Sequence, residues 1–96
     1  MIFHITTRAD WQHQADEAEY EAASLATEGF IHLSTETQVA GVLERYYQDV
    51  PDLLLLHVDP NKLTHDLRYE RATSNEHFPH LYGKLNKDAV VKVEEL

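Results

Sequence analysis

The chain has 96 residues, 43% of them apolar, which predicts one globular domain over residues 1–96 with a single core. It has no cysteine and no signal-peptide pattern, so thiolate metal sites are excluded and we expect a cytoplasmic protein. The formal net charge of −9 disfavours binding to nucleic acid, although a local pocket for one small anionic ligand remains compatible with it. The apolar run at residues 53–56 is too short to cross a membrane.

The first 29 residues predict one strand and two helices. Residues 2–6 are rich in β-formers and predict a strand, whose closing threonines can cap a helix running through Trp11 and Gln14. A second, short helix is predicted over residues 21–27. Gly29 stands where a helix commonly ends in a left-handed residue.

The clearest predicted helix follows a short strand at residues 30–33. Thr35 and Gln38 match a capping box, in which the glutamine side chain reaches back to the cap. The next apolar side chains fall at helical spacing on one face, namely Val39, Val42, Leu43 and Tyr46. Pro51 then ends the helical segment.

The second half of the chain predicts mainly strands. Residues 53–58 are apolar on both faces and predict a central strand, followed by a turn at residues 59–61. Further strands are predicted at residues 67–71 and 89–93, with an irregular extended segment beginning at Pro79. About five short strands with two or three helices, not in regular alternation, predict an α+β fold.

Strand alternation places polar groups on shared faces. His4 points away from its apolar neighbours in the first strand, and His32 and Ser34 share one face of the next. Arg68 and Glu70 likewise share one face of their strand. These groups predict a polar cleft centred on residues 29–34.

Each of these residues also has a structural interpretation. Ser34 can help to cap the following helix, and His4 can be a core histidine bonded to backbone groups. Arg68 and Glu70 can form a surface ion pair worth about 0–1 kcal/mol. The sequence leaves these alternatives open.

Seven histidines raise the question of a metal, but no HxH or HExxH pattern occurs. His4, His32 and His80 are a conceivable zinc set without a spacing that supports it, so we assign no metal. His57 is interpreted as structural, and the remaining histidines as surface groups. A GxSxG elbow, a Walker loop and a Rossmann fingerprint are all missing.

Several segments together resemble the bacterial family called domain of unknown function 952. They are Ile2-Phe3-His4-Ile5, Ser24-Leu25, Glu28 to Ser34, Gln38, Leu67-Arg68-Tyr69-Glu70 and Phe78-Pro79-His80-Leu81-Tyr82-Gly83. The resemblance covers almost the whole chain. It implies a small ADP-ribosyltransferase-like fold, a group that includes the RNA 2′-phosphotransferases.

That resemblance also implies roles for single residues. His4 resembles the histidine that holds the nicotinamide ribose, and Glu70 the acidic residue that binds a ribose hydroxyl. His32-Leu33-Ser34 is similar to a segment of the phosphotransferases. The tyrosine pair that surrounds nicotinamide in the wider group is not assigned in this sequence, and Tyr20 and Tyr82 are the candidate substitutes for it.

Three functions follow as hypotheses. The first is a transferase acting on NAD or a nucleotide, with His4, His32 and Glu70 as catalytic groups and no resident cofactor, since NAD would be the substrate. Its ligand-binding groups would be Ser34, Arg68, His80 and Tyr82. The second is a non-catalytic module that binds a small anionic metabolite or nucleotide. The third is a protein-interaction domain that uses residues 78–83 as an aromatic anchor. The sequence leaves the oligomeric state open.

Overall fold

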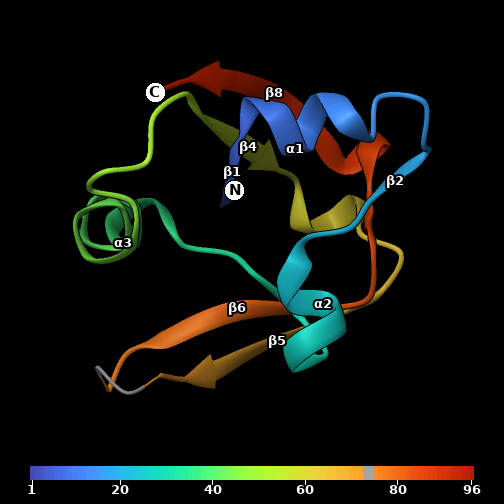
Figure 1. Ribbon diagram of the computed structural model, residues 1–96. Coiled ribbons are helices and arrows are strands. Elements are labelled where there is room, and N and C mark those ends of the chain that lie inside the picture. Colours follow the sequence, from blue (N-terminus) through green and yellow to red (C-terminus); the bar gives the residue numbers. More distant parts are fainter. Residues whose placement is uncertain (73–74) are drawn as a thin grey trace.

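The computed structural model describes residues 1–72 and 75–96 (Figure 1). The strands are β1 (Ile2–Thr7), β2 (Glu19–Tyr20), β3 (Ile31–His32), β4 (Leu53–Val58), β5 (Asp66–Arg71), β6 (His77–Tyr82), β7 (Leu85–Asn86) and β8 (Val90–Glu95). The helices are α1 (Arg8–His13), α2 (Ala23–Glu28) and α3 (Val39–Tyr46). Short 3₁₀ turns are η1 (Glu36–Gln38), η2 (Pro60–Lys62) and η3 (Lys87–Ala89).

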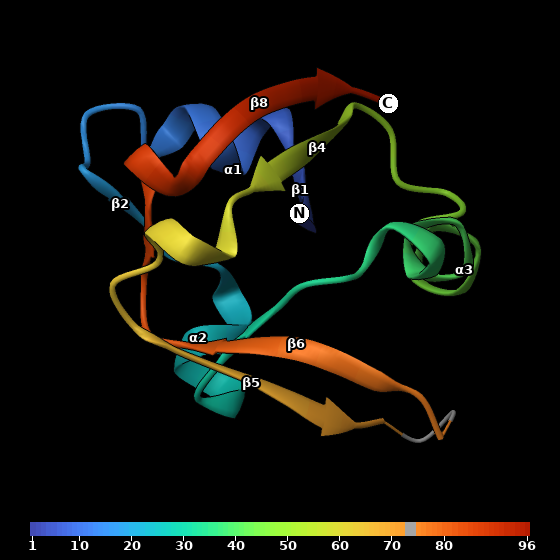
Figure 2. The ribbon, with the colours of Figure 1, turned by 180° about the vertical axis from the view of Figure 1, so that it is seen from behind.

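The strands form three small antiparallel sheets, so the predicted α+β class is confirmed. Their orders are β1-β4-β8, β3-β6-β5 and β2-β7. A single bridge between Phe3 and Ser34 connects the first two sheets. Figures 1 and 2 show these two sheets at opposite ends of the molecule, with α3 to one side and α2 beside β6.

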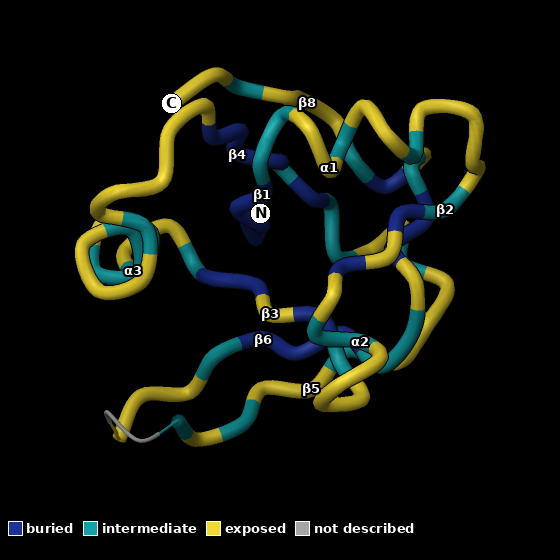
Figure 3. Tube along the Cα trace, in the orientation of Figure 1, coloured by how far each residue is buried: buried dark blue, intermediate teal, exposed yellow. Residues whose placement is uncertain are grey.

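The predicted central position of β4 is confirmed, because it lies between β1 and β8. Its alternate side chains enter two apolar clusters. Leu56 and Val58 pack with Ile31 and Leu81 of the second sheet, while Leu55 faces α3. Figure 3 shows burial along β1, β4 and the middle of β6. Full burial of a leucine such as Leu56 stabilises the fold by about 2 kcal/mol, and truncating it to alanine costs about 2–5 kcal/mol.

The helix predicted after Thr35 is confirmed, with one correction to its apolar face. Gln38 Oε1 accepts from Thr35 N at 3.0 Å, as a capping box requires. Val39, Val42 and Leu43 pack on the core, but Tyr46 is 68% exposed. Tyr47 packs on this cluster instead, since it lies four residues after Leu43 and so close to the same face of the helix.

The other two predicted helices are present at slightly different positions. Thr7 caps α1 by accepting from Asp10 N at 3.1 Å. The second helix begins at Ala23, two residues later than expected. Gly29 ends it with φ +88° and donates to Leu25 O at 3.1 Å, so the predicted left-handed residue is confirmed.

The expectation of about five strands was wrong, since the described residues form eight. The irregular segment predicted at Pro79 is the central strand β6. A proline is tolerated there because β3 pairs only as far as His80, and Pro79 contributes its carbonyl, which accepts from Leu33 N at 3.0 Å. No helix in the described part of the chain is long and apolar enough to span a membrane.

Candidate functional site

One face of the β3-β6-β5 sheet carries most of the predicted site residues. The register places Arg68 opposite His80, Glu70 opposite Phe78 and Asp66 opposite Tyr82. Directly opposed residues of an antiparallel pair point to the same side. The other side of this sheet, with Leu67 and Leu81, packs on the core, so the polar groups gather on the outer face. We call Phe30, His32, Arg68, Glu70, His80 and Tyr82 the polar cluster.

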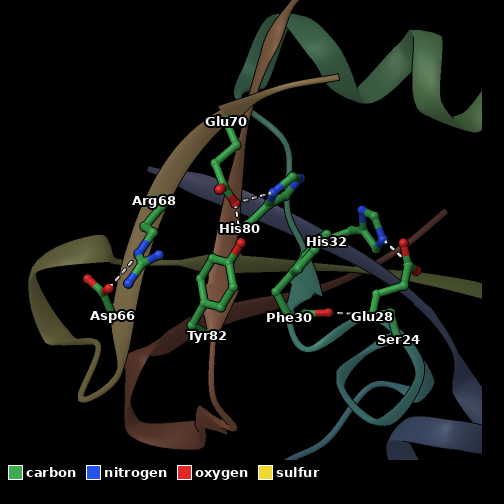
Figure 4. A network of polar contacts seen from close by, with 9 residues as sticks. All are labelled: Ser24, Glu28, Phe30, His32, Asp66, Arg68, Glu70, His80 and Tyr82. Carbon is green, nitrogen blue, oxygen red and sulfur yellow. Dashed lines mark hydrogen bonds and ion pairs between the residues drawn. The ribbon is translucent and has the colours of Figure 1, made fainter. Parts of the chain in front are cut away.

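Glu70 is the centre of the polar cluster (Figure 4). Its Oε1 accepts from the Tyr82 hydroxyl at 2.5 Å and from His80 Nδ1 at 2.9 Å. These two hydrogen bonds, Tyr82 first, hold the pKa of Glu70 below its ordinary value, because both stabilise the ionised carboxylate. The same contact raises the pKa of Tyr82. No hydrogen bond from the described residues reaches Oε2, and the side chain is 39% exposed.

Arg68 borders this carboxylate on the solvent side. Its guanidinium carbon lies 4.7 Å from the centre of the Tyr82 ring, and its Nε donates to Asp66 Oδ2 at 2.7 Å. The terminal guanidinium nitrogens make no hydrogen bond to the described residues. The side chain is 59% exposed, so these nitrogens can meet an anion from solvent.

Phe30 and His32 form the other border. The Phe30 ring stacks on His80 with centroids 4.0 Å apart and planes 20° from parallel. Ser24 Oγ donates to Phe30 O at 2.8 Å and fixes this segment as it leaves α2. His32 is 53% exposed, and its Nε2 lies 3.0 Å from Glu28 Oε2. Glu28 had no predicted role. Its i,i+4 spacing to His32, across the Gly29 turn, is the sequence signal that could have predicted this contact.

His4 is not part of the polar cluster. It is 6% exposed and turns its ring toward Tyr20, whose hydroxyl lies 3.3 Å from Nε2. Its Nδ1 donates to His32 O at 2.7 Å, which leaves Nε2 to accept from Tyr20. Burial lowers the pKa of His4 from 6.5 to about 4, so the ring is neutral near pH 7. This geometry matches the structural interpretation of His4, a core histidine bonded to its neighbours, which the sequence left open as an alternative to a catalytic role.

Ser34 lies at the junction of the two main sheets. Its N donates to Phe3 O at 2.7 Å, and its O accepts from Phe3 N at 2.8 Å. Within the described residues its side chain has no hydrogen bond to the polar cluster, and Thr35 provides the helix cap. The structure therefore brings together five of the seven predicted site residues and leaves Ser34 and His4 apart from them.

The polar cluster is accessible to solvent, because the side chains of Arg68, His32 and Glu70 are 59%, 53% and 39% exposed. Two hollows lie elsewhere on the surface. One of about 450 Å³ is lined by Trp11, Leu54, Lys87 and Val93, and one of about 390 Å³ is lined largely by acidic side chains near Glu19. Over residues 1–72 and 75–96, no group of three or more histidine and carboxylate side chains is arranged to hold a metal ion.

Comparisons with known proteins place the chain in a family. Its structure is similar to the crystal structure of the Caulobacter crescentus protein CC0527, with a TM-score of 0.90 and 31% identity over 99% of this chain and 84% of that one. The solution NMR structure of CC0527 gives a TM-score of 0.84 at 31% identity, over 99% of this chain and 83% of that one. No curated protein matches the sequence. The family model described as "Protein of unknown function (DUF952)" matches residues 5–93, and the chain therefore belongs to this family.

Proposed function

We propose that this protein binds a small ribose- and phosphate-bearing molecule, a nucleotide or NAD, on the polar cluster. One observation carries the proposal: Glu70 is held by His80 and Tyr82 through a single oxygen, which leaves Oε2 to accept from a ligand. A fixed, ionised carboxylate with one open oxygen suits the hydroxyl groups of a ribose. Its lowered pKa keeps it an acceptor at neutral pH.

The groups around Glu70 support the same class of ligand. Arg68 on one side has exposed terminal guanidinium nitrogens suited to a phosphate, and the exposed ring of His32 borders the other side. The guanidinium cation of Arg68 matters because the chain as a whole carries −9. Phe30 and Tyr82 present aromatic surface for a base or nicotinamide ring.

The test is a titration of the ¹⁵N-labelled protein with AMP, ADP-ribose and NAD at millimolar concentration. We expect chemical-shift changes at His32, Glu70 and Tyr82, and a dissociation constant at least about tenfold larger in Glu70→Gln. Glu44→Gln, an exposed change on α3, is the matched control and should bind as the wild type does. Shift changes confined to other surfaces, or none at all, would refute the proposal.

A second candidate is transfer of the ADP-ribosyl group from NAD on an ADP-ribosyltransferase-like fold. The observation that favours it is the ionised Glu70, because a carboxylate beside the ribose stabilises the positive charge that develops as nicotinamide leaves with the bonding electron pair. An acceptor nucleophile would then take the ribosyl carbon. The buried His4, with both ring nitrogens engaged, supports simple binding better than it supports this reaction.

Release of nicotinamide from NAD separates the two candidates. Turnover that is lost in Glu70→Gln and retained in Glu44→Gln would establish the transferase. NAD binding at the polar cluster without any nicotinamide release would establish the binding module.

A further inference from the structure

The outer side of β8 is a free strand edge. Among the residues that the structure describes, β8 pairs only with β4, and Figures 1 and 2 both show it along the rim of the molecule with no described segment beyond it. Leu96 N donates to Leu53 O at 3.0 Å, so the backbone groups of Leu96 face β4. Alternate residues of an antiparallel strand direct both N–H and C=O to the same side. The N–H and C=O of Val93 and Glu95 therefore point outward, away from β4.

Apolar side chains are exposed along this same edge. Val91 is 48% exposed, Val93 43% and Leu96 52%. Proteins commonly guard a free edge with charges or bulges, because an open edge invites another strand. Here the bulge lies at Val91, at the beginning of the strand, and leaves the residues after it in regular pairing. The edge thus offers both unpaired backbone groups and apolar side chains to an added strand.

The charges of β8 select one antiparallel register with a second copy of the same strand. If the two-fold axis falls at Val93, Lys92 of each copy lies directly opposite Glu94 of the other. An axis at Lys92, Glu94 or Glu95 would place like charges opposite each other, which is unfavourable. An axis at Val91 would fall on the bulge. Only the Val93 axis combines opposite charges with outward-pointing backbone groups.

We propose that a second copy of this chain adds to β8, antiparallel and centred on Val93, so that the two three-stranded sheets become one continuous sheet. Val93 of the two copies exchanges two backbone hydrogen bonds across the axis. Lys92 meets Glu94 of the other copy. Both side chains are available for this contact, because no carboxylate of the described residues pairs with Lys92. Glu94 uses only Oε1 toward His57 Nε2, at 2.7 Å. The lysine then specifies the register instead of blocking the edge.

A contact between two short strands is small, so we expect a dimer that forms and dissociates readily, with a dissociation constant in roughly the micromolar to millimolar range. Sedimentation from about 10 µM to about 1 mM should show the mass rising from 11.1 kDa toward twice that value. Over the same range the amide of Val93 should become protected from hydrogen exchange. In the monomer this group faces water and exchanges rapidly.

Charge variants test the register. Lys92→Glu and Glu94→Lys should each weaken association at least about tenfold, and the double variant should recover it, because the pair is restored with reversed sign. Lys62→Glu changes the net charge equally on exposed η2 and should associate as the wild type does. Circular dichroism checks that each variant is folded. A mass of 11.1 kDa at every concentration would overturn the proposal, as would association that Lys92→Glu leaves unchanged.

Discussion

The Tyr82 hydroxyl donates a 2.5 Å hydrogen bond to Glu70, although the two residues are not opposite each other in the β5–β6 ladder. Glu70 is paired with Phe78, so its side chain must run along the sheet face past His80 to reach the tyrosine. Both donors then approach the same carboxylate oxygen. The charge of Glu70 is thus positioned by the sheet itself, as the proposed binding of a ligand to this carboxylate requires.

Tyr82→Phe should raise the pKa of Glu70 toward its ordinary value, because the hydroxyl is the larger of the two contributions that lower it. A lowered carboxylate pKa contributes stability that is present above the ordinary pKa and is lost as the pH falls through the folded value. The measurement is the NMR titration of the Glu70 side-chain carboxyl carbon in both proteins. Tyr69→Phe is the control, because Tyr69 is exposed on β5 next to Glu70, and it should leave the Glu70 titration unchanged. An unaltered Glu70 pKa in Tyr82→Phe would contradict the hydrogen bond.

Acidification should destabilise the protein through His4. Its pKa is about 4 in the fold and 6.5 in the unfolded chain, so the unfolded state binds a proton first as the pH falls from 6.5 to 4. This residue should account for a loss of about 3 kcal/mol in the free energy of unfolding across that interval. Urea denaturation of the wild type and of His4→Gln at pH 7 and pH 4.5 gives the difference.

The comparison depends on the change with pH and not on stability at one pH. His4→Gln should be less stable than the wild type at pH 7, yet should lose less on acidification. His13→Gln, on the exposed end of α1, should show the wild-type pH dependence. An NMR titration that places the His4 pKa near 6.5 would rule out the buried, neutral ring.

Local sequence patterns predicted the elements that local interactions form. The capping box at Thr35, the left-handed Gly29 and the threonine cap of α1 involve groups within four residues of each other. The strands β2 and β7 were missed because each has two residues and exists only through pairing between Glu19–Tyr20 and Leu85–Asn86. Nothing within either segment specifies a partner so distant in the chain.

The same distinction applies to the candidate site. Alternation correctly placed Arg68 and Glu70 on one side of their strand, but the register that sets Arg68 opposite His80 arises from pairing between strands. Alternation also placed His4 on the face of β1 that points away from Phe3 and Ile5. Both faces of β1 are nevertheless buried. Whether a polar side chain in a strand faces solvent or core depends on what covers the sheet, and a pattern of period two does not specify it.

Tyr20→Phe should destabilise the fold by about 1–3 kcal/mol, because its hydroxyl satisfies two buried groups at once. It lies 2.8 Å from Thr6 Oγ1 and 3.3 Å from His4 Nε2. Removing it leaves the ring nitrogen without a donor in the core. Urea denaturation measures the loss. Tyr46→Phe, on a ring that is 68% exposed, should change the free energy of unfolding by less than about 0.5 kcal/mol.

Two glycines should respond in opposite directions to alanine. Gly29→Ala should cost about 1 kcal/mol, because φ is +88° and an L-residue is strained there, although nothing lies within 4 Å of the added methyl group. Gly41→Ala, inside α3, should stabilise the protein by about 0.5–1 kcal/mol. There the methyl group meets only the flexible end of Arg45, at 3.3 Å.

The pair separates backbone strain from side-chain crowding. Thermal and urea denaturation of both variants give the two signs, and Gly29→Asn should recover part of the loss because asparagine tolerates the left-handed region. Because the Gly29 turn carries the chain from α2 into β3, its strain should also disturb the contact between Glu28 and His32. A stable Gly29→Ala variant with an unchanged His32 environment would show that the turn can form without a left-handed residue.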